Sequence, residues 1–527
     1  MKNMKQRFSG FLGGRNFASA VFVAIVIAAV VLVNVICTTL TEALGLYIYP
    51  QQMPDFTISD TFSEVFAEAE ERGESITVTF CMEEEDLKLH STGSYVYETA
   101  KKFKEKYGDF ITLRYINLVT MYDGDGNDVS EELKIYEKDM RGVKQSVAKS
   151  TVIFRSGDNY KVLTDYTSGV GFVDFFTLDS EGYVTSYRGE EVFASMMNWV
   201  LVDDHGVAYF TVGHGETANQ PLYTALTCAG YYVDTINLRD RRILSDSSSG
   251  EAKKLSVSEM MEKLDEADLI LISNPTSDFE RAAEGSGVTA ELDLLDYYAE
   301  GGGSFFVTVD PYSPEAKMKN FFGFLRDFGI EMFDYEDGDR VVRQTVQDLS
   351  NGLPTDSFTL VTEFGEDEKA QQMKNLLGDS RVILRDVSPL KLSGKAVPLL
   401  VTSEDSKCYA GGEVTDTSGG YAVAAYSEML SQTGKTAELF FIPSVYLTAT
   451  DAMVTNGYGN KDFVYALFDV LYGMDDMPYG TNSIVYDDTV LENLTMGTAK
   501  GITAVLLAIP CVIAIAGAVV LIRRKNR

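Results

Sequence analysis

Apolar and polar positions between Val207 and Leu238 predict a strand, a turn, a short helix and a second strand. Val207–Val212 is a short, β-rich apolar run, which is typical of a strand buried on both faces. Gly213-His214-Gly215-Glu216 then turns the chain, because glycine adopts backbone angles that other residues resist. Pro221 suits the first turn of the helix, and the next strand is predicted at Tyr232–Leu238. This βαβ unit predicts a parallel sheet with helices on its faces.

The same alternation of strands and helices resumes further along and extends the predicted sheet. Arg239–Ser258 is polar and serine-rich and predicts an exposed loop. Thr289 is placed to cap a helix that ends at Gly301-Gly302-Gly303. Further elements are predicted as strands at Asp268–Ser273, Ser304–Val309, Val397–Thr402, Tyr421–Tyr426 and Ala437–Ile442, and as a closing helix at Asn460–Tyr472. Together they predict an α/β domain over residues 201–475.

The preceding residues, 56–200, predict a smaller domain with the element order β-α-β-α-β-β. Its elements are expected as strands at Glu74–Cys81 and Phe110–Leu118, helices at Tyr95–Tyr107, Glu131–Met140 and Glu190–Leu201, and a hairpin of Ser150–Phe154 with Lys161–Leu163. This order resembles a thioredoxin-like domain. Cys81 is followed by Met82, Glu83 and Glu84, so no resolving thiol is present and disulfide exchange is not expected.

Two uncharged apolar runs, residues 17–40 and 501–522, are each long enough to predict a transmembrane helix. Basic residues lie in the short tails 1–16 and 523–527, which the positive-inside rule assigns to the cytoplasm. Residues 476–500 form the expected linker to the second span. These patterns predict a protein of the cell (cytoplasmic) membrane, with both termini cytoplasmic and the large domain extracytoplasmic.

The charge of the chain narrows the possible partners. The formal net charge is −33 at pH 7, and such a surface repels phosphate backbones, so no nucleic-acid partner is expected. The five cysteines show no metal-type spacing, and the three outside the apolar runs are predicted to be buried small side chains.

Polar residues follow several predicted strands at the point where each strand ends. In a parallel sheet these carboxyl ends line the crevice where ligands bind. The candidate ligand- or partner-binding residues are His214, Glu216, Asn274, Thr276, Asp310, Tyr312 and Ser444. The alternative for each of them is a structural role in capping a turn or a helix.

Catalytic, metal and cofactor sites are not predicted. The chain holds only three histidines, which does not favour a multi-histidine metal site. The acidic run Asp123–Asp128 lacks the glycine and the final glutamate of a calcium loop and predicts a hairpin turn. Gly434-Lys435-Thr436 resembles a phosphate loop, but Met429 replaces its first glycine and a strand follows it. No cofactor is therefore expected.

Several segments resemble a known family when they are taken in order. They are VAYFTVGHGE, ADLILISNPTSDF, LLDYYAEGGGSFFVTVDP, AELFFIPS and GNKDFVYALFDVLYG. Together they resemble the auxiliary component of ABC-type transport systems first associated with gliding motility. The resemblance implies a thioredoxin-like domain followed by a flavodoxin- or amidotransferase-like α/β domain without catalytic residues, flanked by two transmembrane helices. His214, Glu216 and Asp310 fall on the HGE and DP motifs of that family.

The resulting expectation is a non-catalytic, membrane-anchored auxiliary subunit that binds a ligand or a partner. Its partners would be an ABC-2-type permease and a separate ABC ATPase, with an envelope ligand also considered. One alternative is an envelope hydrolase that uses His214, Glu216 and Ser444. Another is an extracytoplasmic scaffold or sensor, although its cytoplasmic tails are short.

Overall fold

The computed structural model describes residues 57–485, apart from 165–171, 179–183, 218, 245–251, 314–316, 338–339, 354–355, 456 and 482. All described residues belong to one unit, Thr57–Arg527. Because this unit holds both predicted domains, the boundary predicted between 56–200 and 201–475 stays a prediction. The predicted tails, and the predicted linker 476–500 beyond residue 485, lie outside the described residues.

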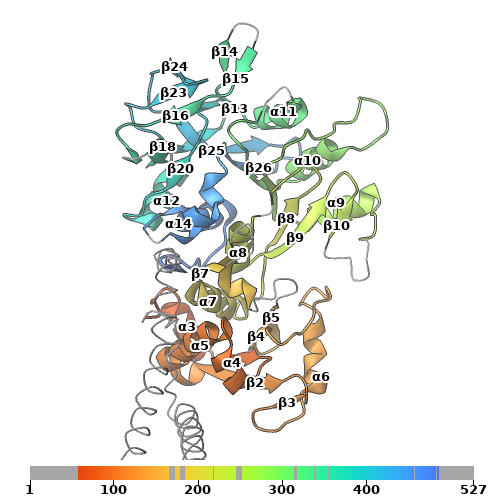
Figure 1. The fold of residues 1–527 in the computed structure, drawn as a ribbon. Coiled ribbons are helices and arrows are strands. Elements are labelled where there is room, and N and C mark those ends of the chain that lie inside the picture. Colours follow the sequence, from red (N-terminus) through yellow and green to blue (C-terminus); the bar gives the residue numbers. More distant parts are fainter. Residues whose placement is uncertain are drawn as a thin grey trace, which may run out of the picture. The chain divides into compact units, whose positions relative to one another are not determined.

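A five-stranded sheet is formed by the N-terminal part of this unit, in the order β3-β2-β1-β4-β5. Its strands are β1 Ile76–Phe80, β2 Ile111–Asn117, β3 Tyr122–Asp123, β4 Val152–Ser156 and β5 Asn159–Leu163. Strand β1 pairs in parallel with β2 and antiparallel with β4, and Val78 lies opposite both Leu113 and Phe154. Helices α5 (Gly93–Tyr107) and α7 (Gly189–Trp199) contact each other and the sheet (Figure 1).

The helix predicted at Glu131–Met140 is wrong in length. Only α6 Ser130–Leu133 and a 3-10 turn at Ile135–Glu137 form there. The Asp139 carboxylate accepts hydrogen bonds from the N–H groups of Arg141 and Val143, so a local turn replaces the next helical turn. The Asp123 carboxylate likewise accepts from nearby backbone N–H groups, which confirms the predicted acidic turn.

The buried cysteines confirm their predicted role as small core side chains. Cys81, Cys228 and Cys408 are all buried and unpaired. Burial raises the pKa of each thiol to about 12, so each is protonated at neutral pH.

A nine-stranded sheet carries the larger part of the fold, in the order β10-β9-β8-β11-β12-β26-β25-β22-β19. Its strands are β8 Val207–Thr211, β9 Tyr232–Asn237, β10 Arg242–Ile243, β11 Leu269–Ser273, β12 Ser304–Thr308, β19 Glu363–Phe364, β22 Val397–Val401, β25 Ala422–Leu430 and β26 Thr436–Ile442. The run from β9 to β26 is parallel, and the remaining pairs are antiparallel. The predicted parallel sheet is therefore present, with antiparallel strands added at its ends.

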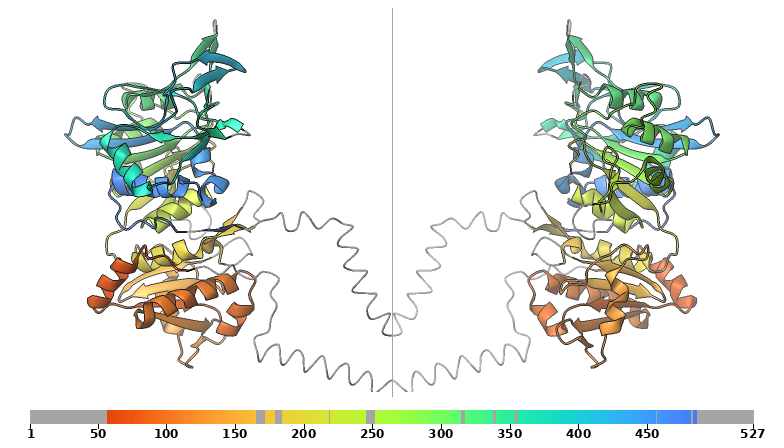
Figure 2. Two further views of the ribbon diagram at one scale, coloured as in Figure 1. Left: turned by 90° about the vertical axis from the view of Figure 1, so that its left-hand side faces the viewer. Right: turned by 90° about the vertical axis from the view of Figure 1, so that its right-hand side faces the viewer.

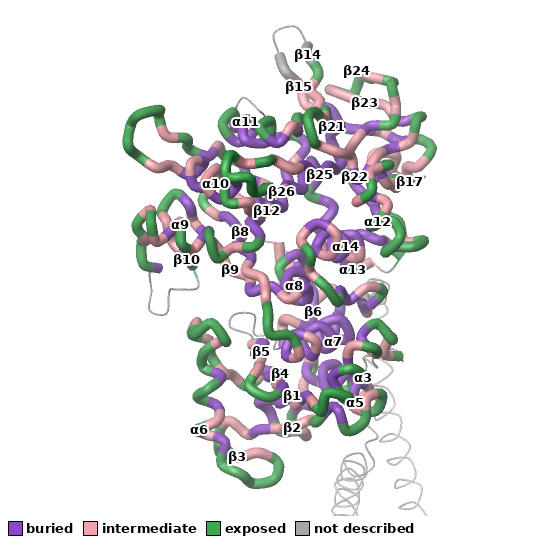
Figure 3. Tube along the Cα trace, turned by 180° about the vertical axis from the view of Figure 1, so that it is seen from behind, coloured by how far each residue is buried: buried purple, intermediate pink, exposed green. Residues whose placement is uncertain are grey.

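Helices cover both faces of this sheet (Figures 1 and 2). They are α8 Gln220–Cys228, α9 Val257–Asp265, α10 Glu291–Glu300, α11 Lys319–Asp327, α12 Glu368–Leu377 and α14 Asn460–Tyr472. Phe305 contacts Tyr298 of α10, whereas Phe440 of the neighbouring strand contacts Phe463 of α14. Strands β12, β25 and β26 are mostly buried as a result (Figure 3).

Local sequence signals explain some helix ends and fail at others. Asn219 caps α8 by accepting from the N–H of Leu222, and Pro221 lies in the first turn as predicted. Thr289 does not cap α10, because the cap position belongs to Ala290, whose N–H donates to Asp293. Part of the loop expected at Arg239–Ser258 is instead the short strand β10.

A buried ionic cluster joins α7 to α14. The Glu191 carboxylate lies 3.3 Å from Arg188 Nε and 3.6 Å from Lys461 Nζ, and it accepts a hydrogen bond from Tyr465. Burial acts to raise the pKa of Glu191, but the two cations and Tyr465 outweigh it and hold that pKa below its usual range. The cluster therefore ties a helix of the five-stranded sheet to a helix of the nine-stranded sheet.

The predicted flanking membrane helices and the membrane location need correction. No helix in the described part of the chain is long and apolar enough to cross a bilayer. The apolar runs that suggested them, residues 17–40 and 501–522, lie outside the described residues. An apolar run predicts a span only where it forms a helix of about 20 residues. The fold class supported here is therefore the mixed α/β architecture alone.

Replacing Asn460 by alanine is expected to destabilise the fold. Its buried side chain accepts from the N–H of Ile383 and donates to the carbonyl groups of Ile383 and Leu447. Alanine leaves these buried groups unpaired, so chemical denaturation should show a loss of about 2–4 kcal/mol in the free energy of unfolding. Asn375→Ala, on the exposed side of α12, is the matched control and should change this free energy by less than ~0.5 kcal/mol. Equal effects would contradict the prediction.

Candidate functional site

The candidate site lies where the strand order of the nine-stranded sheet reverses. The chain leaves β8 for β9 on one side and later returns to pair β11 with the other side of β8. The carboxyl ends of β8 and β11 therefore meet at a switch point, where ligands bind in open α/β sheets. His214 and Glu216 follow β8, and Asn274 and Thr276 follow β11.

The turn after β8 passes very close to the turn after β11. The carbonyl oxygen of His214 accepts hydrogen bonds from the backbone N–H of Thr276 at 2.8 Å and from its hydroxyl at 3.1 Å. Gly215 has a φ of +78°, and a Cβ on it would lie 2.2 Å from Thr276 Oγ1. The structure thus confirms that this turn needs glycine, and the close approach joins two predicted site residues.

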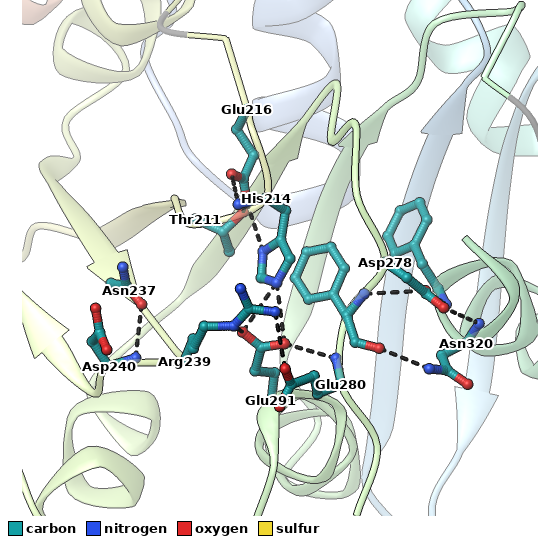
Figure 4. A network of polar contacts seen from close by, with 12 residues as sticks. Thr211, His214, Glu216, Asn237, Arg239, Asp240, Asp278, Glu280, Glu291 and Asn320 are labelled. Carbon is teal, nitrogen blue, oxygen red and sulfur yellow. Dashed lines mark hydrogen bonds and ion pairs between the residues drawn. The ribbon is translucent and has the colours of Figure 1, made fainter. Parts of the chain in front are cut away.

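His214 is held between two carboxylates (Figure 4). Its ring is 1% exposed; Nε2 lies 3.0 Å from Glu291 Oε1, and Nδ1 lies 3.4 Å from Glu216 Oε1. Glu216 Oε2 also accepts from the backbone N–H of His214 at 2.7 Å. The ring of Phe279 stacks on the imidazole, with ring centres 3.8 Å apart. Both ring nitrogens are therefore engaged, and one face of the ring is covered.

Neighbouring donors hold the two carboxylates in position. The Thr211 hydroxyl donates to Glu216 at 3.0 Å, and the backbone N–H of Glu280 donates to Glu291 at 2.7 Å. Arg239 Nε lies 3.4 Å from Glu291 and brings a second cation to the network (Figure 4). Two cations thus face two buried carboxylates, which limits the cost of burying the charges.

Phe279, which covers the imidazole, is itself fixed by α11. The Asp278 carboxylate accepts from the backbone N–H groups of Asn320 and Phe321 at the start of that helix (Figure 4). The Asn320 side chain in turn donates to the carbonyl oxygen of Phe279 at 2.9 Å. Hydrogen bonds between α11 and the adjacent residues Asp278 and Phe279 therefore fix the Phe279 ring over the imidazole.

The charges of this network make His214 a cation at neutral pH. Burial acts to lower the pKa of His214, but the hydrogen bonds and charges of Glu216 and Glu291 outweigh it and raise the pKa to about 9. Burial acts to raise the pKa of each carboxyl, yet His214 holds both below the usual range. An imidazolium with both N–H groups engaged cannot accept a proton, so this arrangement does not provide a general base.

Asn274, Asp310 and Tyr312 form turns that follow their strands. Asn274 has a φ of +54°, and its side chain accepts from the backbone N–H of Asp310 at 2.9 Å. The Asp310 carboxylate accepts from the N–H of Tyr312 at 2.8 Å. The Tyr312 side chain is 58% exposed, which leaves it accessible to a binding partner.

Ser444 lies apart from His214. It follows β26, and β11 and β12 separate that strand from β8. Its buried hydroxyl donates to the carbonyl oxygen of Arg385 at 2.8 Å and accepts from the N–H of Tyr446. The pairing of Ser444 with His214, on which the hydrolase alternative depended, is therefore absent.

Sequence analysis did not mark several residues of the network, among them Arg239, Phe279 and Glu291. Glu291 lies four residues before Leu295 and next to Leu292, on the apolar face of the predicted helix. A carboxylate on such a face was the signal that could have indicated a buried polar contact. Nothing local marked its partner, because 77 residues separate it from His214. Among the described residues, no group of histidine, cysteine or acidic side chains is arranged to hold a metal ion.

Comparisons with known proteins find distant likenesses in structure only. No protein-family model and no curated protein matches the sequence. The mmIFT52 N-terminal domain is 14% identical with a TM-score of 0.36, covering 51% of this chain and 99% of its own. A cytoplasmic protein from Salmonella typhimurium is 10% identical with a TM-score of 0.29, covering 50% and 98%. PurLQS from Thermotoga maritima is 11% identical with a TM-score of 0.26, covering 51% and 100%. At these low TM-scores the likenesses carry no conclusion about function.

The stability of the protein is expected to fall at alkaline pH as His214 loses its proton. Its folded pKa of about 9 exceeds the ordinary value of 6.5, so the stabilisation is complete below pH 6.5 and is lost as the pH rises through 9. The lowered pKa values of Glu216 and Glu291 give the opposite slope in acid, where protonation of the carboxyls removes their stabilisation. Denaturation across this range should show an alkaline loss of about 3 kcal/mol.

NMR of carbon-labelled histidine tests the assignment directly, since the chain has only three histidines. One ring should titrate near pH 9, and the ring of His205, whose pKa burial and Lys161 lower to about 4, should remain neutral. The alkaline titration should vanish in His214→Gln. Three histidines that all titrate near their ordinary pKa would refute the clamped imidazolium.

Gly215→Ala is expected to destabilise the fold more than an unobstructed glycine substitution does. The added Cβ meets both a positive φ and the Thr276 hydroxyl, so the expected loss in unfolding free energy is about 3 kcal/mol. Gly157→Ala is the matched control, because its φ is +57° and no atom lies within 4 Å of the added Cβ. Thermal unfolding should show only the cost of strain there, about 1–2 kcal/mol. Identical losses would mean that the contact with Thr276 adds nothing.

Proposed function

We propose that this chain is a non-catalytic auxiliary subunit of an ABC-2-type transporter, which binds a ligand or partner beside a permease and a separate ATPase. The observation that carries the proposal is the engagement of both nitrogens of His214 by Glu216 and Glu291. The HGE residues of the family resemblance, His214 and Glu216, therefore have a structural role at the switch point. A binding role fits such a site better than proton transfer.

Exposed groups on the loops around this network offer a surface for a partner protein. Arg239 and Glu280 form an ion pair at 3.1 Å, with side chains 45% and 67% exposed. Tyr312 is more than half exposed after β12. Tyrosine and arginine are the residue types that contribute most to protein interfaces. We therefore assign contact with the permease to the loops that carry these three residues.

The proposal includes a separate ATPase because the one segment that resembles a phosphate loop does not have the structure of one. Gly434-Lys435-Thr436 follows β25 and opens directly into β26, so it does not form the strand–loop–helix unit that binds nucleotide phosphates. In this proposal a separate ATPase supplies the energy for transport. In the part of the chain that the structure describes, no contact favours the hydrolase alternative, because Ser444 donates to a backbone carbonyl group and both ring nitrogens of His214 contact carboxylates.

Affinity purification of the tagged full chain from its own cells tests the proposal. After brief cross-linking, mass spectrometry should identify a polytopic permease and an ABC ATPase as the enriched polypeptides. Repeated recovery of the chain alone would contradict the proposed function.

A double variant and a control variant test the assigned contact surface. Tyr312→Ala combined with Arg239→Ala should reduce recovery of the permease at least ~tenfold, since such anchors each contribute more than about 1 kcal/mol. Tyr335→Ala is the control, because this exposed tyrosine lies in the separate hairpin β14 Tyr335–Asp337 with β15 Arg340–Val342. Undiminished recovery with the double variant would place the contact elsewhere.

A further inference from the structure

A cavity separate from the His214 network lies between β5 of the five-stranded sheet and α8 and β9 of the nine-stranded sheet. Its volume is about 340 Å³, which is enough for a small ligand. Its polar lining includes the cations Arg141 and Lys161 and the carboxylates Asp139 and Asp174. Two cations and two carboxylates therefore line the same cavity.

The ammonium group of Lys161 is surrounded by aromatic rings. Its Nζ lies 3.7 Å from the ring centre of Trp199 and 5.2 Å from that of Tyr232. No carboxylate in the described part of the chain forms an ion pair with it. Aromatic faces attract a cation, but they do not supply the hydrogen-bond acceptors that its three N–H groups need.

Arg141 shares one of these rings with Lys161. Its guanidinium carbon lies 4.3 Å from the ring centre of Tyr232. The nearby Asp139 accepts hydrogen bonds from two backbone N–H groups, and its contact with Arg141 Nε is long, at 3.7 Å. Asp139 therefore forms a long ion pair with Arg141 and does not bridge the two cations.

Burial, more than repulsion between charges, leaves the ammonium group of Lys161 poorly stabilised. Burial lowers the pKa of Lys161 to about 8, Asp139 and Asp174 act to raise it, and Arg141 acts to lower it. An anion bound between Arg141 and Lys161 would supply the hydrogen-bond acceptors that the Lys161 N–H groups lack.

We propose that this cavity binds a small ligand through a carboxylate or phosphate group that bridges Lys161 and Arg141. The planar guanidinium of Arg141 can donate two parallel hydrogen bonds to such an oxyanion, and Lys161 adds a localised charge. The strong negative charge of the whole chain disfavours casual anion binding, so binding here depends on these two side chains. The inference goes beyond the transporter role and stands on the contacts of this cavity alone.

Trp199 provides the measurement, because it is the only tryptophan of the chain and Lys161 lies against its ring. The purified full chain is titrated with sodium phosphate and with sodium malonate, with ionic strength held constant by sodium chloride. A saturable change in tryptophan emission is expected with at least one of the two probes, and the responsive probe identifies the phosphate or carboxylate class. Sodium chloride alone should produce no saturable change.

Variants separate a specific site from general ionic effects. Lys161→Gln and Arg141→Gln should each weaken the apparent affinity at least ~tenfold, because each removes one partner of a charged hydrogen bond. Lys149→Gln is the control, since this exposed lysine pairs with Asp86 on the surface and should leave the affinity unchanged.

Two results would overturn the proposal. One is that neither phosphate nor malonate changes the tryptophan emission or the melting temperature of the protein. The other is unchanged affinity in both variants. Arg141→Gln leaves the contact between Lys161 and Trp199 in place, so it decides the matter even if Lys161→Gln fails to fold.

Discussion

The pairing of β8 with β9 on one side and β11 on the other is the constraint on which the rest of the structure depends. It reverses the strand order and brings the carboxyl ends of β8 and β11 together. The turn at Gly213–Glu216 then has to fit against the turn that carries Thr276, which leaves no room for a Cβ on Gly215. The position of His214, and with it the whole polar network, follows from this backbone contact.

Burial of a charged group at this point determines what the site can do. An imidazolium in an apolar interior requires compensation, which Glu216 and Glu291 supply from two different elements. Both ring nitrogens of His214 are engaged by these contacts, so the residue joins the turn after β8 to α10. Arg239, Glu280 and Tyr312, on neighbouring loops, keep exposed side chains.

Among the described residues, the buried cation Lys161, unlike His214, lacks a carboxylate that forms an ion pair with it. There, Lys161 and Arg141 lie against aromatic rings, and Asp139 and Asp174 offset the burial of Lys161 only in part. Both sites rest on contacts between distant parts of the chain: His214 meets a residue 77 positions away, and Lys161 of β5 meets Trp199 of α7. The difference lies in compensation, which is complete at one site and incomplete at the other.

The sequence by itself determined much of the element pattern. The apolar runs predicted β8, β9, β11, β12 and β26, and α14 spans Asn460–Tyr472 as predicted. Periodicity succeeds there because burial on a fixed face imposes a regular spacing of apolar side chains. It failed for Glu131–Met140, where the Asp139 side chain competes for backbone N–H groups.

Only the tertiary structure decided which polar residues meet. The sequence marked His214, Glu216 and Thr276, but it gave no sign that Glu291 and Phe279 would enclose the imidazole, or that Ser444 would lie three strands away from β8. Local spacing records the period of one helix or strand, whereas strand order sets the distances between elements. The charge state of His214 depends on those distances, and it was therefore decided by the fold.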